Sequence, residues 1–251
     1  MRISISYLFL VQLGCSRVSH DAPDATLDSH VVVDGGDLFC SEFAGQADVP
    51  FVGHFSSTDA SQDSFVAQAC SSNDAIAIHV GCQAQSPMTS VTITAPGWDI
   101  QQIGSLGGTS NQIWASSFVA ISPQAQVPTT FTVTWAPSSC TSVWEVGDEL
   151  TQIDLTAGAS PFDGHAEVSG IGDCQTRLLK GSADDVLWGA CSSSGHLMNF
   201  GQNYSPGTSD GFWHWTEYQL STDPPGTLES VGFQNTPGES FVMTAIAVKH
   251  K

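Results

Sequence analysis

Basic residues are almost absent from this chain. It carries 6 Lys and Arg against 25 Asp and Glu, for a formal net charge of −19, and no Lys or Arg lies between Val18 and Thr176. Without clustered cations, no stretch can neutralise the phosphates of a nucleic acid or the headgroups of an anionic lipid. The composition therefore excludes nucleic-acid binding through a basic patch. A surface charged with one sign is typical of a secreted protein that must stay soluble.

Sequence patterns that bind metals or cofactors are also missing. The 7 cysteines contain no Cys-x-x-Cys pair, and the 8 histidines contain no His-x-His or His-Glu-x-x-His arrangement, which argues against zinc. Asp34-Gly35-Gly36-Asp37 is the nearest calcium-loop candidate, but it lacks the acidic ligands that should follow. We therefore expect no cofactor, and the ligand spacing does not support calcium. His79, inside a predicted strand, is expected to be a hydrogen-bonded interior residue.

The first uncharged, mostly apolar run of the chain is short and leads to a cysteine. Ile3 to Val11 follows a single arginine, is too short to span a bilayer, and is closed by a small glycine directly before Cys15. This order is typical of a bacterial lipoprotein signal of residues 1–14, after which Cys15 is lipidated and becomes the new N-terminus. Gln12 stands where an aliphatic residue is preferred, so an ordinary cleaved signal is the alternative. The predicted location is the bacterial cell envelope, at the outer membrane, or secreted without the lipid.

The number of cysteines agrees with lipidation. Seven would leave an odd one in an exported protein, whereas removal of Cys15 leaves six, enough for three disulfides. The predicted pairs close short loops where they can, and they are Cys70–Cys82, Cys174–Cys191 and, by elimination, Cys40–Cys140. A bond from Cys82 to Cys140 is the alternative if their strand ends are neighbours.

Strand-like texture begins at about Phe39 and continues to the end. Residues 15–38 have few large apolar side chains and predict a flexible acidic tether. From 39 to 251, short runs rich in Val, Ile, Thr, Phe and Trp alternate with clusters of Gly, Pro, Ser and Asn. Residues 61–69 are expected to make a short surface turn of helix, and no repeat of fixed period is visible. We predict one all-β domain over 39–251, a two-sheet antiparallel sandwich of the jelly-roll or concanavalin-A-like type.

Alternation of apolar and polar residues locates the individual strands. The final segment, Phe241 to Lys249, is apolar on both faces and is therefore expected to be central in its sheet. The expected strands are 52–56, 75–82, 90–95, 98–103, 112–121, 130–135, 142–146, 165–169, 186–190, 197–200, 213–220, 228–234 and 241–249.

The densest acidic cluster lies in a strand-like run, Trp144 to Glu149. Retaining glycoside hydrolases built on concanavalin-A-like sandwiches place carboxylates at alternate positions of one strand, so that they face the same groove. Glu145 and Glu149 fall on one face, but the position between them is Gly147, which predicts a bulge or turn. The simplest interpretation is a structural glutamate near a strand end. A glycan-cleaving hydrolase that uses Glu145 and Glu149 is the alternative.

Tryptophan gives a better lead to a binding surface. Trp213 and Trp215 fall on one face of a predicted strand. If they face solvent, two indole rings make a flat apolar platform of the kind on which sugar rings stack. The simpler interpretation is that both fill the core, as we expect of the other five tryptophans.

Several short segments occur in a characteristic order and spacing. They are Asn73–Ile78, Ser90–Ile93, Ile113–Ala115, Thr132–Trp135, Val143–Gly147, Ala183–Gly189, Trp215–Tyr218 and Phe241–Met243. In order and spacing they resemble a family of uncharacterised secreted bacterial β-sandwich domains. The resemblance implies a two-sheet jelly-roll-type sandwich, export, no assigned catalytic residue, and a structural role for Glu145. The six cysteines are not a general feature of that family.

Together these features favour a non-catalytic module rather than an enzyme. The chain has no intact catalytic constellation, no cofactor loop and no basic surface. We expect a surface-tethered β-sandwich lipoprotein that serves as an adhesion module or binds a glycan or protein, with the lipid anchor on Cys15 as its contact with the membrane.

Overall fold

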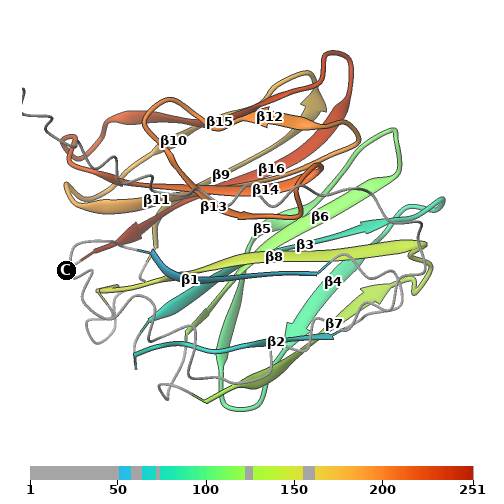
Figure 1. Cartoon of the computed structure of the whole chain (residues 1–251), viewed down its shortest axis with the longest axis horizontal. Helices are drawn as coiled ribbons and strands as arrows, with labels where there is room; N and C mark the ends of the chain where they lie inside the picture. Colours follow the sequence, from blue (N-terminus) through green and yellow to red (C-terminus); the bar gives the residue numbers. More distant parts are fainter. Residues whose placement is uncertain (1–50, 58–63, 72–73, 122–126, 155–161, 251) are drawn as a thin grey trace, which may run out of the picture. The chain divides into compact units, whose positions relative to one another are not determined.

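The computed structural model describes residues 51–57, 64–71, 74–121, 127–154 and 162–250, which contain sixteen β-strands and no helix (Figure 1). All strand pairs are antiparallel, so the predicted all-β antiparallel class is confirmed. Nothing in these ranges could cross a membrane as an apolar helix. The predicted signal, tether, Cys15 and Cys40 lie outside the described residues.

The first eight strands form two facing sheets. A five-stranded sheet has the order β1-β8-β3-β6-β5, and a three-stranded sheet has the order β2-β7-β4. Their inner faces bury one apolar core, in which Phe131 of β7 packs with Ile76 and Ile78 of β3. The strands are β1 (Phe51–Ser57), β2 (Ser64–Ala67), β3 (Ala75–Gln83), β4 (Ser90–Thr94), β5 (Asp99–Gly108), β6 (Ile113–Ile121), β7 (Thr129–Ala136) and β8 (Ser142–Leu150).

The last eight strands repeat this arrangement. A five-stranded sheet has the order β13-β14-β11-β16-β9, and a three-stranded sheet has the order β10-β15-β12. Phe233 and Val231 of β15 pack with Leu187 of β11 in a second core. The strands are β9 (Phe162–Ile171), β10 (Cys174–Leu179), β11 (Asp185–Ser193), β12 (Leu197–Asn199), β13 (Ser205–Ser209), β14 (His214–Ser221), β15 (Leu228–Asn235) and β16 (Ser240–Lys249).

The two sets of eight strands, here called the first and second halves, share one strand order. Renumbering β9–β16 as one to eight gives 1-8-3-6-5 and 2-7-4 in both halves. The same turn also enters the third strand of each half, because the backbone N–H of Ser71 donates to Asp74 (3.0 Å) and that of Ser182 donates to Asp185 (3.1 Å). The described strands thus form four sheets, where the sequence predicted two. The jelly-roll or concanavalin-A-like subtype stays a prediction.

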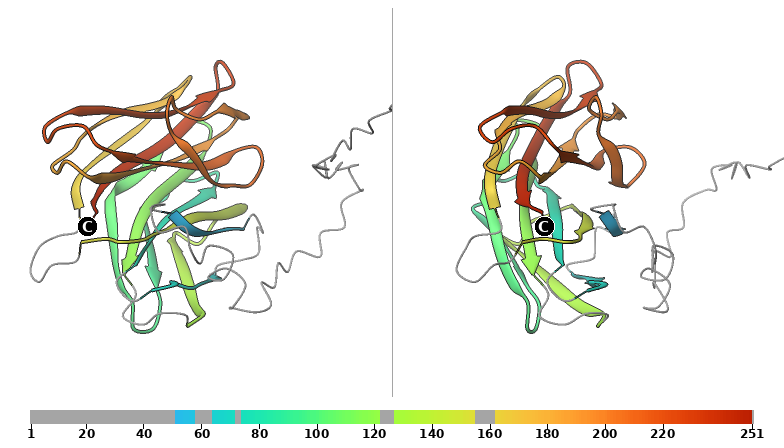
Figure 2. Two further views of the ribbon diagram at one scale, coloured as in Figure 1. Left: turned by 60° about the vertical axis from the view of Figure 1, so that its left-hand side comes forward. Right: turned by 90° about the vertical axis from the view of Figure 1, so that its left-hand side faces the viewer.

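The two five-stranded sheets pack against each other. Figure 2 shows the strands of the first half, blue to yellow-green, beside those of the second half, orange to red. Between these sheets, Ala77 and Val119 of the first half share an apolar cluster with Trp188 and Ile246 of the second. Strand β3 lies against β11, β5 against β9, and β1 against β13. These pairs are the ones that an approximate two-fold axis through the central strands would produce. We call the layer in which the two five-stranded sheets touch the seam.

All thirteen expected strands are present, although several are longer than expected. Strand β16 lies between β11 and β9 and is buried on both faces, which confirms its predicted central place. The expected helical turn at 61–69 is wrong, because Ser64–Ala67 is strand β2, paired with β7. Strands β10 and β13 were not expected either.

One of the three predicted disulfides is present. Cys174 bonds Cys191, as predicted. Cys82 bonds Cys140, with 5.5 Å between their Cα atoms, so the alternative pairing is confirmed and the predicted Cys70–Cys82 and Cys40–Cys140 pairs are wrong. The reason is the pairing of β3 with β8, which brings the end of β3 beside the residues that lead into β8. Cys70 is also disulfide-bonded, to a partner outside the described residues.

Candidate functional site

The two glutamates of the hydrolase alternative are buried. Glu145 and Glu149 are 1% and 3% exposed. Gly147 between them pairs with Ile78 in a regular register, so the predicted bulge or turn is wrong. The Cys70 backbone N–H donates to Glu149, and burial, with the nearby Asp74 carboxyl, raises the pKa of Glu149 to about 8. These carboxyl groups do not line an open groove that a polysaccharide could enter.

Asp148 of β8 points the other way, into the seam, and it is completely buried. One carboxylate oxygen accepts a hydrogen bond from the Trp188 indole N–H of the second half (2.6 Å). The other accepts from the backbone N–H (2.9 Å) and hydroxyl (2.8 Å) of Thr208 in β13. Burial raises the pKa of Asp148, because removing water destabilises the charged form. The carboxyl group therefore links the two halves by hydrogen bonds, although its burial away from water costs free energy.

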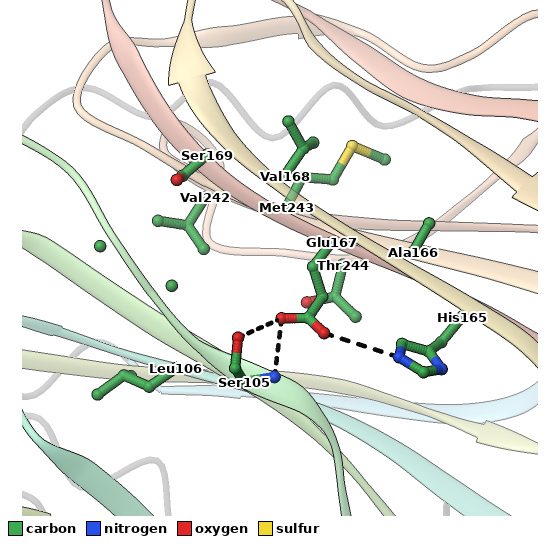
Figure 3. Close-up of a pocket in the computed structure, with 12 residues that line it drawn as sticks. Ser105, Leu106, His165, Ala166, Glu167, Val168, Ser169, Val242, Met243 and Thr244 are labelled. Atoms are coloured by element: carbon green, nitrogen blue, oxygen red, sulfur yellow. Dashed lines mark hydrogen bonds and ion pairs between the residues drawn. The ribbon is translucent and has the colours of Figure 1, made fainter.

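Glu167, on the first strand of its half where Asp148 is on the eighth, makes a similar contact in the opposite direction (Figure 3). Its carboxylate accepts hydrogen bonds from the backbone N–H (2.7 Å) and hydroxyl (2.9 Å) of Ser105 in β5 of the first half. The His165 ring lies 3.8 Å from the other carboxylate oxygen. In both halves, strand five thus offers a backbone N–H and a hydroxyl to a carboxylate of the other half. We call these contacts the Asp148 clasp and the Glu167 clasp.

A glycine precedes the hydroxyl residue in each clasp. The pairing of β5 with β6 shifts register between Ile103 and Gly107, and that of β13 with β14 shifts between Pro206 and Ser209. Such irregularities re-aim the backbone. Gly104 has φ +73°, and a Cβ there would overlap a Glu167 carboxylate oxygen. A side chain at that position is therefore incompatible with the seated carboxylate.

A polar depression of about 460 Å³ surrounds the Glu167 clasp, lined by β5, β9 and β16 (Figure 3). Its ionisable side chains are Glu167 and His165, and the Glu167 carboxylate already has partners from Ser105. Among the residues that the structure describes, no cluster of three metal-ligating side chains exists here or elsewhere. The depression offers hydroxyl groups and backbone, and its Ser105 hydroxyl already donates to the Glu167 carboxylate.

A second polar group lies in the seam, around two histidines. His79 of β3 is fully buried, as expected, with its ring nitrogens 2.8 Å from the hydroxyls of Ser117 and Ser192. Ser192 also accepts from the Trp144 indole N–H (2.9 Å), and the His214 ring stacks on Trp144 with centroids 4.0 Å apart. Burial lowers the pKa of both histidines to about 3. Both rings are therefore neutral at pH 7.

The best-defined exposed feature is the turn between β13 and β14. One carboxylate oxygen of Asp210 accepts the backbone N–H groups of Phe212 (3.0 Å), Trp213 (2.9 Å) and His214 (3.0 Å). The Phe212 carbonyl also accepts the N–H of Leu197, which ties the turn to β12. The turn is thus fixed by its own hydrogen bonds before any partner arrives.

This turn holds aromatic side chains out to solvent. Phe212 and Trp213 are 51% and 43% exposed, with ring centroids 5.6 Å apart. The exposed His196 ring lies 5.0 Å from Phe212 and 5.9 Å from Trp213. We call these three residues the aromatic tip. Sequence analysis identified Trp213 but missed His196 and Phe212; the Asp-Gly turn signal at 210–211 is the one feature that could have indicated them.

Trp215, the other predicted platform residue, does not belong to the tip. Its ring stacks on Phe200 with centroids 4.7 Å apart and packs against the core of the second half. Trp213 precedes β14, so the two tryptophans do not share a strand face. The shared Trp213–Trp215 platform is therefore wrong, and the simpler interpretation that both fill the core holds for Trp215 but is wrong for Trp213, which is exposed. Trp135, Trp144 and Trp188 are buried, as expected of core residues.

No family model, curated protein or solved structure matches this chain. The resemblance to secreted bacterial β-sandwich domains stays a prediction. The function is therefore inferred from the chain's own residues.

Proposed function

We propose that this protein is a non-catalytic, lipid-anchored module of the bacterial cell envelope that binds its partner through the aromatic tip. The observation that carries this proposal is the pair of half-exposed rings, Phe212 and Trp213, on a turn fixed by Asp210. Exposed large aromatic side chains that lie together mark interaction sites on soluble proteins. Aromatic residues also dominate the binding energy of many interfaces.

The rigidity of the turn supports binding in particular. Ordering a mobile loop on association costs free energy that is subtracted from the affinity. Here three backbone N–H groups are already bonded to one Asp210 oxygen, and the Gly211 N–H donates to Ser209 (2.8 Å). The backbone that carries the aromatic rings is thus already ordered in the free protein.

The hydrolase alternative is not favoured. A retaining glycosidase needs two carboxyl groups about 5 Å apart on either side of an accessible glycosidic bond. Glu145 and Glu149 are buried instead. If the purified protein cleaved a glycan, and Glu145→Gln abolished the cleavage, the non-catalytic assignment would be wrong.

Binding by the tip can be tested with single substitutions. Trp213→Ala and Phe212→Ala each remove an exposed ring, and Leu228→Ala is the matched control, an exposed apolar residue at the other end of β15 from the tip. Binding of the mature protein to defined panels of glycans and of purified surface proteins would be measured. We expect a partner whose binding is lost in both tip variants and kept in the control. Equal binding by all three variants contradicts the proposal.

The anchor is a separate part of the proposal and falls outside the described residues. If Cys15 carries the lipid, the wild-type protein enters the detergent phase of a phase-separation extraction, because buried acyl chains hold it there. Cys15→Ser should leave it in the aqueous phase or uncleaved. Partition of the wild type into the aqueous phase would leave an ordinary secreted protein and would not affect the role of the tip.

A further inference from the structure

We propose that the partner of the aromatic tip is a neutral glycan and that its binding surface continues onto the first half through Asn111. This inference rests on the proposed binding function. It adds the chemical class of the partner and a polar residue from the other half of the molecule.

The continuity follows from one contact across the seam. Asn111 belongs to the exposed turn 109–112 between β5 and β6, and its side-chain amide donates to the Ser194 hydroxyl (3.4 Å). Ser194 lies two residues before His196, the member of the tip that contacts both Phe212 and Trp213. The first-half turn therefore borders the tip.

The turn that carries Asn111 is also fixed by its own backbone. The N–H of Gln112 donates to the Thr109 carbonyl (3.1 Å), and the N–H of Thr109 donates to the Ile113 carbonyl (2.9 Å). Ser110, Asn111 and Gln112 are exposed. Two rigid turns, one aromatic and one rich in amides and hydroxyls, thus lie next to each other.

This combination matches the two faces of a sugar ring. The C–H face of a pyranose is apolar and can stack on an indole or phenyl ring. The hydroxyl groups around the ring both donate and accept hydrogen bonds. Side-chain amides and hydroxyls have the same dual capacity. Phe212 and Trp213 therefore supply the stacking surface, and the turn 109–112 supplies the polar contacts.

The size of the tip favours a glycan over a protein. A large aromatic residue buries 150–250 Å² in total, so Phe212 and Trp213, about half exposed, have roughly 200 Å² left to bury between them. A stable protein interface takes about 800 Å² from each partner. The remaining aromatic area suits one or two sugar rings.

The local charge favours a neutral glycan over an acidic one. No Lys or Arg occurs in residues 109–112, 194–198 or 209–214. The acidic groups that support the tip are Asp210, within the turn, and Glu239, which accepts a hydrogen bond from the Ser194 hydroxyl (2.7 Å). Sulfated or sialylated sugars would therefore meet negative charge without a compensating cation.

The test uses the mature protein and an array of neutral gluco-, galacto-, manno- and N-acetylglucosamine oligosaccharides, printed beside sulfated and sialylated forms of the same backbones. Affinities for the best binder are then measured by calorimetry. We expect Trp213→Ala to weaken binding by roughly tenfold or more and Asn111→Ala by about three- to tenfold. Gln202→Ala, which removes an exposed side-chain amide from the β12–β13 connection, is the matched control and should bind as the wild type does.

Each outcome of the experiment tests a separate part of the inference. Tighter binding of the acidic forms would overturn the assignment to a neutral glycan. An unchanged affinity for Asn111→Ala, together with a loss for Trp213→Ala, would overturn the extension to the first half. A purified surface protein whose binding depends on Trp213, with no glycan bound, would overturn this inference and leave the proposed function standing. Failure of every panel member to show dependence on the tip would overturn both.

Discussion

The two clasps make the same contact at different depths, so they give a test of how the halves are held together. Asp148→Ala removes a carboxyl group from the completely buried seam, whereas Glu167→Ala removes one that water can reach. Both changes delete an acceptor that receives a backbone N–H and a hydroxyl. The two carboxylates differ in their burial and in one bond, because Asp148 also accepts the Trp188 indole N–H, so both features contribute to any difference in stability.

The expected magnitudes follow from the bonds left behind. Without Asp148, the Thr208 hydroxyl keeps the Gly147 carbonyl (2.6 Å) and the Thr208 N–H keeps the Thr216 hydroxyl (2.6 Å). The Trp188 indole N–H loses the carboxylate that accepts its hydrogen bond, and a buried unsatisfied donor costs about 1–3 kcal/mol. With the small cavity added, we expect a loss of about 3 kcal/mol. For Glu167→Ala we expect about 0.5–1 kcal/mol, since water replaces the lost acceptor.

Thermal unfolding at pH 7 under non-reducing conditions measures both values. For a chain of this size, about 3 kcal/mol corresponds to a fall in Tm of roughly 6–12 °C, and about 0.5–1 kcal/mol to a fall of roughly 1–4 °C. If Asp148→Ala shifts Tm no more than Glu167→Ala does, the Asp148 clasp does not hold the halves together as described.

Three further predictions concern single residues. Burial raises the pKa of Glu149 from 4.5 to about 8, so the folded state binds this proton more tightly, and the free energy of unfolding should fall as pH rises between these values. Urea unfolding at pH 5, 7 and 9 should show this fall in the wild type and a flatter profile in Glu149→Gln. Cys82→Ser breaks the disulfide that closes a loop of 58 residues, and Cys174→Ser breaks the one that closes a loop of 17. Calorimetry should find that the free energy of unfolding falls by about 4 kcal/mol in the first variant and by about 3 kcal/mol in the second. A larger loss in Cys174→Ser would contradict the dependence on loop length. Gly104→Ala should destabilise the protein by about 1–2 kcal/mol because φ at this position is +73° and the new Cβ would displace the Glu167 carboxylate, and a stability equal to the wild type would contradict both constraints.

The strands were predictable because most of them bury at least one face. In β4 and β7, exposed and buried residues alternate strictly, which is the pattern that a period of two detects. The strands that were missed give a weaker signal. Strand β13 contains Pro206 and Gly207, β10 mixes Gln, Thr and Arg among its apolar residues, and β2 is only four residues long.

The repetition of the fold was not visible in the sequence, because strand order depends on which faces are apolar and not on residue identity. Ser71 and Asp74 in the first half and Ser182 and Asp185 in the second are the same residues in the same turn. Such short matches are too few for a repeat of fixed period to be recognised in the sequence.

The candidate site was predictable only in part, because sequence spacing does not show where a strand begins. Trp213 and Trp215 share a face only if both belong to one strand, but the Asp210 turn ends just before β14 starts at His214. For Asp148, alternation correctly places the carboxyl opposite Glu145 and Glu149. It cannot show that a second sheet covers that face, since the covering residues come from strands far along the chain.

The approximate two-fold axis affects which substitutions can occur at the contact between the halves. Two eight-stranded units of the same strand order that meet face to face are what a symmetric dimer would become if its two genes were joined. In a dimer of identical chains, every substitution at the contact occurs in both subunits. A carboxylate that is buried away from water in one subunit is therefore buried in the other as well. A single continuous chain removes that restriction. The two contacts can therefore differ, as they do here, where the Asp148 carboxylate is completely buried and that of Glu167 is partly exposed.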